Sequence, residues 1–143
     1  MFNAYNFENE EKISKYFNLK FIEVLDDEIN VNGYEIKSYV VSHGEEKPAL
    51  GYLINNQLGL TGDTGICEGV EQIANQSEII IADSLLINGD KCHMGVDNLQ
   101  YLNTKYGKLI ICTHLRDETR QYIKENSSVD GIKALEDFEE FNL

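Results

Sequence analysis

The hydrophobic pattern of this chain changes its period near residue 62, and that change limits the folds it can adopt. Before this point, short apolar stretches alternate with turn dipeptides, of which Asn32-Gly33 and Asn55-Asn56 are the clearest. Such dipeptides between strand-like segments are typical of β-hairpins. The segments predicted as strands in this part of the chain are 20–25, 34–42, 49–54 and 57–62.

Beyond residue 62, continuous apolar segments alternate with segments of helical period. The predicted elements here are strands at 78–83 and 108–113, helices at 67–76, 96–106 and 117–126, and a final strand or extended tail at 131–143. Apolar strands that alternate with helices are typical of a sheet covered by helices. We therefore predict an α/β fold.

The domain organisation is expected to be simple. The sequence contains no linker or repeat, so its 143 residues are predicted to form a single domain. Residues 8–17 are predicted as a short amphipathic helix with Ile13, Tyr16 and Phe17 on one face. The expected parts are an N-terminal helix within 1–18, a strand meander at 19–62 and βα units at 63–143.

The charge of the chain narrows the class of ligand. There are 12 Lys and Arg residues against 25 Asp and Glu residues, which gives a net charge of −13. Binding of long nucleic acids depends on neutralising phosphates with Lys and Arg, so a long nucleic-acid groove is disfavoured. A small anionic ligand remains compatible with this charge if a metal ion or helix N-termini supply local positive charge.

Targeting signals and cysteines indicate the compartment. The sequence has no apolar run of about 18 residues, and its N-terminus is acidic where a signal peptide would be basic, so a cytoplasmic protein without a membrane segment is expected. Its three cysteines, Cys67, Cys92 and Cys112, are expected to be reduced thiols. A zinc site built from Cys67, Cys92, His93 and His114 is disfavoured, because there is no CxxC pair and Cys92 and His93 are adjacent.

Polar residues follow the predicted strands at the points where these end. Asp63, Asp83 and His114 each come directly after or at the end of an apolar strand segment. All three histidines of the chain lie in short strings that interrupt apolar runs. Ligand sites of open α/β sheets gather at the carboxyl ends of strands, where loops converge. We therefore expect Asp63, Asp83, His93 and His114 to meet along one edge of the sheet.

Five motifs occur in an order that resembles a known superfamily. They are SHGEEKPALGYLI (42–54), GLTGDTG (59–65), EIIIADSLL (78–86), KCHMGVDN (91–98) and KLIICTHLRDETR (108–120). As an ordered set they resemble the metallo-β-lactamase superfamily, in particular its ribonuclease Z-like and phosphodiesterase-like branch. The resemblance extends from about residue 20 to about residue 125 and implies half of an αββα sandwich, a mixed sheet with helices on one face.

The resemblance implies roles for individual residues. Asp63 would bridge two divalent metal ions, zinc or manganese, and His114 would complete the shell of the second. His93 would act as the catalytic group beside the scissile phosphate, and His43 would border the substrate pocket. The residues expected to orient these groups or to contact substrate are His43, Asp83, Thr64 and Thr113.

The same residues also have structural interpretations when the local sequence is taken alone. Asp63 would then be a turn residue that caps the following helix. His93 would be a partly exposed residue at a helix entry, and His114 a strand-end residue bonded to the backbone. Asp83 would be a solvated carboxylate.

One departure from the superfamily pattern is large. The metal-binding motif His-x-His-x-Asp-His is absent, and residues 1–42 contain no histidine. Of the expected ligands only Asp63 and His114 are present. The chain would therefore be a fragment of a longer hydrolase, one subunit of a split enzyme, or a relative that has lost its metals. A half-sandwich leaves a sheet face uncovered, so each account predicts self-association or a partner chain that completes the sandwich.

Three functions are consistent with this pattern. The first is a metal-dependent hydrolase, phosphodiesterase-like, acting on a small substrate such as a cyclic or short nucleotide. The second is a non-catalytic binding or interaction module that associates with itself or with a full-length partner. The third is a regulatory protein that pairs with a full-length homologue.

Overall fold

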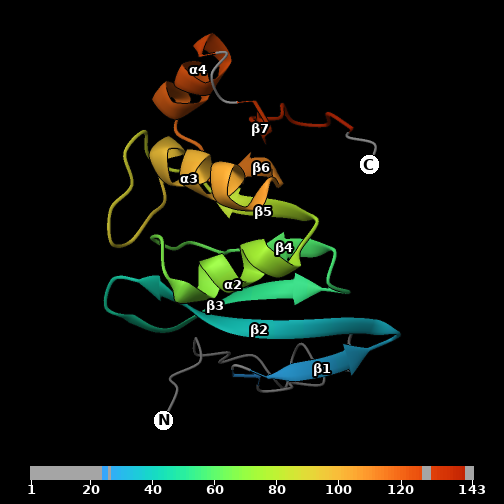
Figure 1. The fold of residues 1–143 in the computed structure, drawn as a ribbon. Coiled ribbons are helices and arrows are strands. Elements are labelled where there is room, and N and C mark those ends of the chain that lie inside the picture. The colour runs from blue at the N-terminus through green and yellow to red at the C-terminus, as the bar shows by residue number, and fades with distance from the viewer. Residues whose placement is uncertain (1–23, 26, 127–129, 141–143) are drawn as a thin grey trace, which may run out of the picture.

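The computed structural model describes residues 24–25, 27–126 and 130–140, and within them one seven-stranded sheet in the order β1-β2-β3-β4-β5-β6-β7 (Figure 1). The strands are β1 (Glu28–Val31), β2 (Tyr34–His43), β3 (Glu46–Ile54), β4 (Leu58–Leu60), β5 (Ile79–Asp83), β6 (Leu109–Thr113) and β7 (Ile132–Lys133). Pairing is antiparallel from β1 to β4 and parallel from β4 to β7. The sheet is therefore mixed, and the change of pairing occurs at the change of hydrophobic period.

The connections explain this topology. Asn32 and Gly33 both have positive φ, at 51° and 89°, between β1 and β2, and Asn55 and Asn56 do the same at 52° and 53° between β3 and β4. Turns of this kind follow the twist of two antiparallel strands, and Asn and Gly tolerate the conformation. The helices α2 (Glu68–Gln76), α3 (Val96–Tyr106) and α4 (Asp117–Glu125) follow β4, β5 and β6 in turn.

Most of the predicted elements are present, and one prediction needs correction. Val24 and Leu25 are not in a strand, although a strand was predicted at 20–25, and residues 20–23 lie outside the described residues. The first described strand is instead Glu28–Val31, whose alternation of polar and apolar residues is too short to stand out in the sequence. The final strand or extended tail predicted at 131–143 is a two-residue strand, Ile132–Lys133, and residues 134–140 are outside helices and strands. The helix predicted at 8–17 also lies outside the described residues.

The helices pack against one face of the sheet. Val70, Ile73 and Ala74 of α2 and Leu99 and Leu102 of α3 are completely buried. They form one hydrophobic cluster with alternate residues of the strands, such as Val41, Ile80 and Ile110. Figure 1 shows α2 and α3 side by side in front of the sheet. The predicted fold class, an α/β mixed sheet with helices on one face, is confirmed.

The opposite side of the sheet, here called the open face, is apolar and partly exposed. Its residues alternate along the strands with those of the core. They are Ile29, Val31, Tyr34, Ile36, Val40, Leu50, Tyr52, Ile54, Leu58, Leu60, Ile79, Ile81, Leu109 and Ile111. Val40 is 48% and Tyr52 37% exposed. The charged residues Glu28, Glu35 and Lys37 of β1 and β2 have the opposite parity and pair with one another on the helical side.

None of the described helices is both long and apolar enough to cross a membrane.

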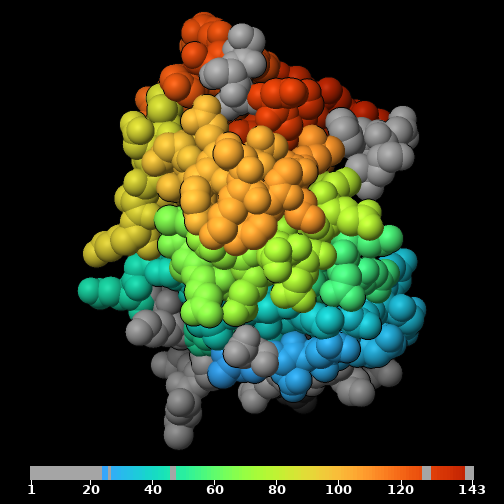
Figure 2. All heavy atoms as spheres, viewed as in Figure 1, coloured from blue at the N-terminus to red at the C-terminus, as the bar shows by residue number. Residues whose placement is uncertain are grey.

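The space-filling view in Figure 2 shows how α2 and α3, in green and orange, cover the middle of the sheet on the helical side. The open face is therefore the apolar surface of the described chain that these helices leave uncovered.

Helix α2 approaches β2 so closely that one position requires glycine. A Cβ atom at Gly69 would lie 2.1 Å from the carbonyl oxygen of Val40. Backbone cannot yield at this distance, so Gly69 sets the depth at which α2 packs on the sheet.

We expect Gly69→Ala to lower the free energy of unfolding by about 1–3 kcal/mol, as overpacking of a filled core does. The control is Gly107→Asn, since Gly107 has φ 65° with open space around it and Asn tolerates this conformation. Urea unfolding followed by circular dichroism measures both variants. Equal stability of the two would show that the close approach is not a constraint.

A polar cluster joins α2 to α3 on the outer side. Glu71 accepts hydrogen bonds from Lys105 at 2.6 Å, Tyr101 at 2.8 Å and Tyr106 at 3.0 Å. The Lys105 ammonium lies 5.1 Å from the centroid of each tyrosine ring. The hydrogen bond from Lys105, followed by those from the two tyrosines, lowers the pKa of Glu71 from 4.5 to about 2. The same contacts raise the pKa of Lys105.

A folded-state pKa below the usual value means that ionised Glu71 stabilises the fold above about pH 4.5, and that this contribution is lost as the pH falls toward 2. We expect Glu71→Gln to lower Tm by about 1–4 °C at pH 7, as the loss of a partly exposed ion pair does. The difference should shrink as the pH is lowered toward 2. Scanning calorimetry across this range tests it, and a difference that is constant with pH would contradict the assignment.

Candidate functional site

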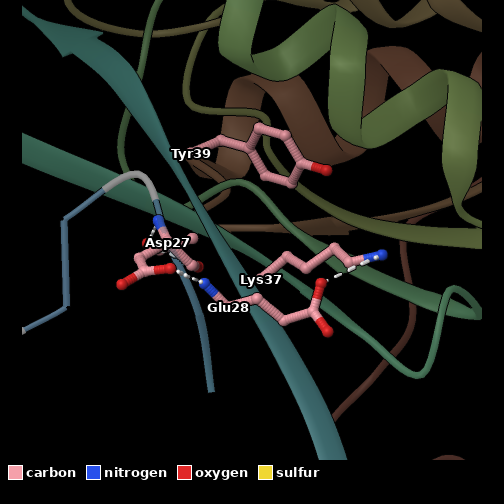
Figure 3. Close-up of a pocket in the computed structure, with 5 residues that line it drawn as sticks. Asp27, Glu28, Lys37 and Tyr39 are labelled. Carbon is pink, nitrogen blue, oxygen red and sulfur yellow. Dashed lines mark hydrogen bonds and ion pairs between the residues drawn. The ribbon is translucent and has the colours of Figure 1, made fainter.

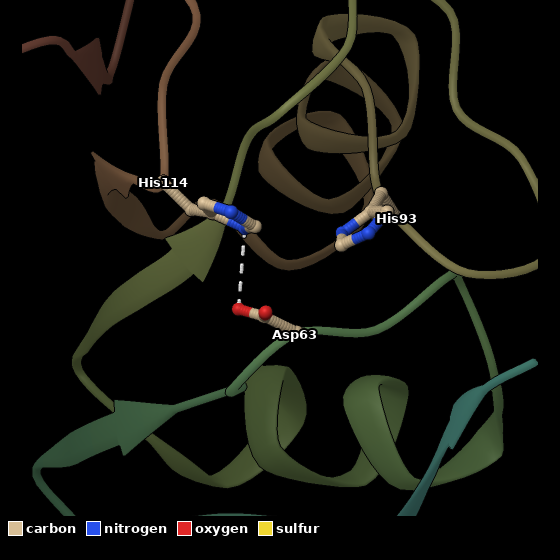
Figure 4. Close-up of side chains that lie close together, drawn as sticks. All are labelled: Asp63, His93 and His114. Carbon is tan, nitrogen blue, oxygen red and sulfur yellow. Dashed lines mark ion pairs between the residues drawn. The ribbon is translucent and has the colours of Figure 1, made fainter. Parts of the chain in front are cut away.

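Residues from three strand-to-helix connections meet at one edge of the sheet. Strands β2, β4, β5 and β6 run in the same direction, so their carboxyl ends share this edge. Asp63 follows β4, Asp83 ends β5, His93 lies in the loop before α3, and His114 follows β6. Figure 4 shows Asp63, His93 and His114 turned toward one another. The predicted convergence of these residues on one edge is therefore present in the structure.

Three of these residues form what we call the donor cluster: Asp63, His93 and His114. One ligand-type atom from each lies within 4.8 Å of the others. The His114 Nδ1 atom is 3.2 Å from Asp63 Oδ1 (Figure 4). Asp63 and His114 are exposed, with side-chain exposures of 52% and 42%, whereas the side chain of His93 is 19% exposed. The cluster is therefore open to a ligand from solvent.

Asp83 lies beneath the cluster and is completely buried. Its carboxylate accepts hydrogen bonds from the backbone N–H groups of Thr64 at 2.9 Å and Leu85 at 3.1 Å. Its Oδ2 atom is 2.9 Å from His93 Nδ1, and its Oδ1 atom is 3.7 Å from His114 Nδ1. A carboxylate accepts only, so the Nδ1 atom of His93 carries the proton and Nε2 is left for another partner.

The three histidine rings form a continuous row. The rings of His43 and His93 are 4.8 Å apart and those of His93 and His114 are 5.2 Å apart, both in edge-to-face arrangement. The Nδ1 atom of His43 lies 2.9 Å from the carbonyl oxygen of Cys92, which accepts its proton. All the imidazoles of the chain therefore stand beside one another at this edge.

The two predicted threonines are placed differently. Thr64 is completely buried, and its hydroxyl accepts a hydrogen bond from Ser42 N and lies 3.0 Å from Ser42 O. This position ties the Asp63 loop to the end of β2 and keeps the hydroxyl away from solvent. Thr113 is exposed and lies opposite Asp83 in the register of β5 and β6. The predicted roles of Thr64 and Thr113 stay predictions, and burial favours an orienting role for Thr64.

Asp90 is a contributor that the sequence analysis did not identify. Its Oδ1 atom accepts hydrogen bonds from the backbone N–H groups of Cys92 at 2.7 Å and His93 at 2.8 Å. These bonds lower the pKa of the Asp90 carboxyl. An aspartate that bonds to the backbone two and three residues further on is typical of an Asx turn, so the string Asp-Lys-Cys-His held the signal. Asp90 fixes the backbone that carries His93.

A pocket of about 350 Å³ adjoins the row of histidines. It is lined by His43 together with Leu25, Val40, Val41, Ser42, Gly44, Pro48 and Ala49. Because His43 also contacts the His93 ring, the pocket and the donor cluster are neighbours. The geometry is compatible with the predicted position of His43 at the border of a substrate pocket.

A second pocket, of about 260 Å³, lies at the start of β1 and is shown in Figure 3. Its lining residues are Asp27, Glu28, Lys37, Ser38 and Tyr39. It shares no residue with the donor cluster, and its Lys37 is already paired with Glu35 and Glu28. This pocket is separate from the candidate site.

The donor cluster fits a divalent metal ion in chemical type and nearly in distance. Two donors that bind one zinc ion at about 2.1 Å lie at most about 4.2 Å apart, and the cluster atoms lie within 4.8 Å. Imidazole and carboxylate are ligands that zinc and manganese accept. Among the described residues, Cys67 and Cys92 join no group of three or more potential ligands. The number of donors falls short of a two-metal centre.

The sequence was compared with known families and proteins. It matches the family described as "Anti-Pycsar protein Apyc1" over residues 3–138. The chain belongs to this family. A search among curated proteins by sequence gives no match.

Solved structures share the fold of this family member. A diphosphatase described as belonging to the PhnP family aligns with TM-score 0.70 and 21% identity, over 93% of this chain and 54% of the diphosphatase. An isothiocyanate hydrolase from Delia radicum gut bacteria aligns with TM-score 0.63 and 18% identity, over 92% of this chain and 63% of the hydrolase. The metallo-β-lactamase fold protein YhfI from Bacillus subtilis aligns with TM-score 0.58 and 15% identity, over 76% and 49%.

These likenesses confirm the predicted fold, which the chain shares with the metallo-β-lactamase fold protein YhfI. The chain spans about half the length of the structures it matches, in agreement with the prediction that it represents half of the sandwich. The narrower assignment to a ribonuclease Z-like or phosphodiesterase-like branch stays a prediction, as do the roles of the individual site residues.

We expect Asp83→Asn to release His93 from its fixed tautomer, because the amide offers an N–H group as well as an oxygen. Nitrogen-15 NMR of the imidazole should show Nδ1 protonated in the original chain and a mixture of tautomers in the variant. Asp63→Asn is the control, since Asp63 contacts His114 and is exposed. An unchanged tautomer in Asp83→Asn would contradict the role given to this carboxylate.

Proposed function

We propose that this chain carries part of the active site of a metal-dependent hydrolase that cleaves a small phosphodiester, such as a cyclic or short nucleotide. The observation that supports the proposal is the meeting of Asp63, His93 and His114 over the buried Asp83. A structural explanation would account for one buried ion pair, whereas here exposed donors are held in place by a buried carboxylate. Such an arrangement is typical of sites that bind and react.

Each residue of the site would have a separate role in the reaction. Asp63 and His114 would hold the divalent ion, which supplies a hydroxide nucleophile and neutralises phosphate charge when bound. His93 keeps its Nδ1 proton toward Asp83. As a general acid it would carry a second proton on Nε2, give that proton to the leaving oxygen and return to the neutral ring. Asp90 and Asp83 fix the backbone and the ring of His93.

The size and charge of the chain support a small substrate. A net charge of −13 repels long polyanions, whereas a small phosphodiester meets the row of three imidazoles locally. The apolar pocket beside His43 is of a size that suits the organic group attached to the phosphate. The family description names an anti-Pycsar protein, and we include an action of this kind in the proposal.

A second candidate is a non-catalytic binding or interaction module. The observation that favours it is the shortage of ligands: the described residues contain one group of three potential donors and no other. A third candidate, a regulatory protein that pairs with a full-length homologue, rests on the same shortage.

We expect the purified chain with added manganese or zinc to hydrolyse bis-p-nitrophenyl phosphate. Asp63→Ala and His114→Ala should lose both metal binding and turnover. His93→Ala should retain metal binding while kcat falls about 10²–10⁴-fold, the usual contribution of a general acid. Glu78→Gln is the control, because Glu78 is exposed and lies directly before the first residue of β5, at the end of the strand away from Asp83.

Calorimetric titration with metal and absorbance at 400 nm are the two measurements. Absence of both metal binding and turnover would favour the non-catalytic module. Turnover only after addition of a second polypeptide with the His-x-His-x-Asp-His motif would identify a split enzyme.

A further inference from the structure

The open face is large and mostly apolar, with the exposed Lys133 on its edge strand β7, and it ends at the donor cluster. Ile81 and Asp83 lie on the same side of β5, two residues apart, and Ile111 and Thr113 do so on β6. The open face therefore runs along these strands directly up to the edge where Asp63, His93 and His114 meet. A surface that covered this face would come next to the cluster.

We infer that a second copy of this chain packs on the open face and brings its own donor cluster to the same edge, so that two copies build one metal site. The packing of the faces rests on the fold alone, whereas the shared site rests on the proposed function. Asp63 and His114 of the two copies together supply four ligands, twice the number in one chain, and His93 of each copy stays beside them as the acid.

The symmetry of the sheet permits this arrangement. A twofold axis that lies between the two sheets and runs along the strands places both carboxyl edges at the same end of the dimer. Strand β4 is the middle one of seven, and Asp63 follows it. An axis along β4 would place the two Asp63 loops opposite each other across packed sheets, which stack about 10 Å apart. An axis across the strands would separate the clusters.

The flat area of the face approaches the area that each partner buries in a standard interface. Six neighbouring strands at about 4.8 Å spacing give a width of about 29 Å, and the five residues of β5 and β6 span about 16 Å. The flat area is on the order of 500 Å² per copy before side-chain relief is counted, against about 800 Å² of accessible surface per partner in a standard interface.

The charges of the chain determine how association of two copies should depend on salt. Glu28, Glu35 and Lys37 point to the helical side. Lys133 of β7 lies on the open side, but an axis along β4 places β7 opposite β1 of the second copy, so this charge does not meet its own image. The net charge of −13 acts between the copies at longer range and opposes their approach. Association should therefore strengthen with salt, because the Debye length falls from about 10 Å at 0.1 M to about 3 Å at 1 M.

The test compares aromatic residues on and off the face. Tyr52 is on the open face and 37% exposed, and Phe138 is exposed and follows the last strand. Sedimentation equilibrium should show a dimer that strengthens with salt in the original chain and in Phe138→Glu. Tyr52→Glu should dimerise at least about tenfold more weakly, because dimerisation would bury the new carboxylate on the open face without a partner. The carboxylate of Phe138→Glu would stay exposed.

Tyr52→Lys separates packing from net charge. It makes the chain less acidic, so a dimer weakened in this variant as well would show that apolar packing is the cause. A circular dichroism spectrum and Tm close to those of the original chain establish that the variants fold. A monomer at every salt concentration and chain concentrations up to about 100 µM would overturn the inference. So would a dimer that both Tyr52 variants leave intact.

Zinc titration tests the shared site without any measurement of turnover. We expect the metal affinity of Tyr52→Lys to fall at least tenfold relative to Phe138→Glu, although its own two metal ligands, Asp63 and His114, are unchanged. Equal affinity in the two would overturn the shared site. Failure of hydrolysis with both results intact would count against the proposed function alone, so the two failures are distinguishable.

Discussion

The buried carboxylate of Asp83 is the contact on which the arrangement of the site depends. It ends β5, accepts the backbone N–H groups of Thr64 and Leu85, and holds the ring of His93. Thr64, 19 residues earlier, and His93, 10 residues later, are thereby fixed to one strand end. A buried carboxylate that lost these partners would be costly, so the fold and the orientation of His93 are maintained by the same hydrogen bonds.

The strands and helices were largely predictable because each part of the sequence has one dominant period. EIIIAD and KLIICT are too apolar to be anything but buried segments, and the Asn-Gly and Asn-Asn turns fix the hairpins. Strand β1 was missed because EINV is short and has exposed polar residues. Residues 28–31 form a strand because they pair with β2, and the strand propensity of their own sequence is too weak to predict it.

For the site, the sequence supplied the residues and their common edge, but not their contacts. The rule that loops converge at the carboxyl ends of strands was sufficient to bring Asp63, Asp83, His93 and His114 together. The role of Asp90 and the edge-to-face row through His43 depend on the path of the loop from 84 to 95, which no periodicity describes. The uncovered apolar face, in turn, followed from the resemblance to half of a sandwich.

The order of the strands has a consequence for the way the chain folds. Among the described strands, each pairs only with its neighbours in sequence, from β1 through β7. The hairpins from β1 to β4 close short loops, whereas the parallel pairs from β4 to β7 form across helices, so the hairpins are expected to form first. The sheet and its helices can thus assemble progressively during synthesis, without waiting for a distant segment to return, before any second layer is added.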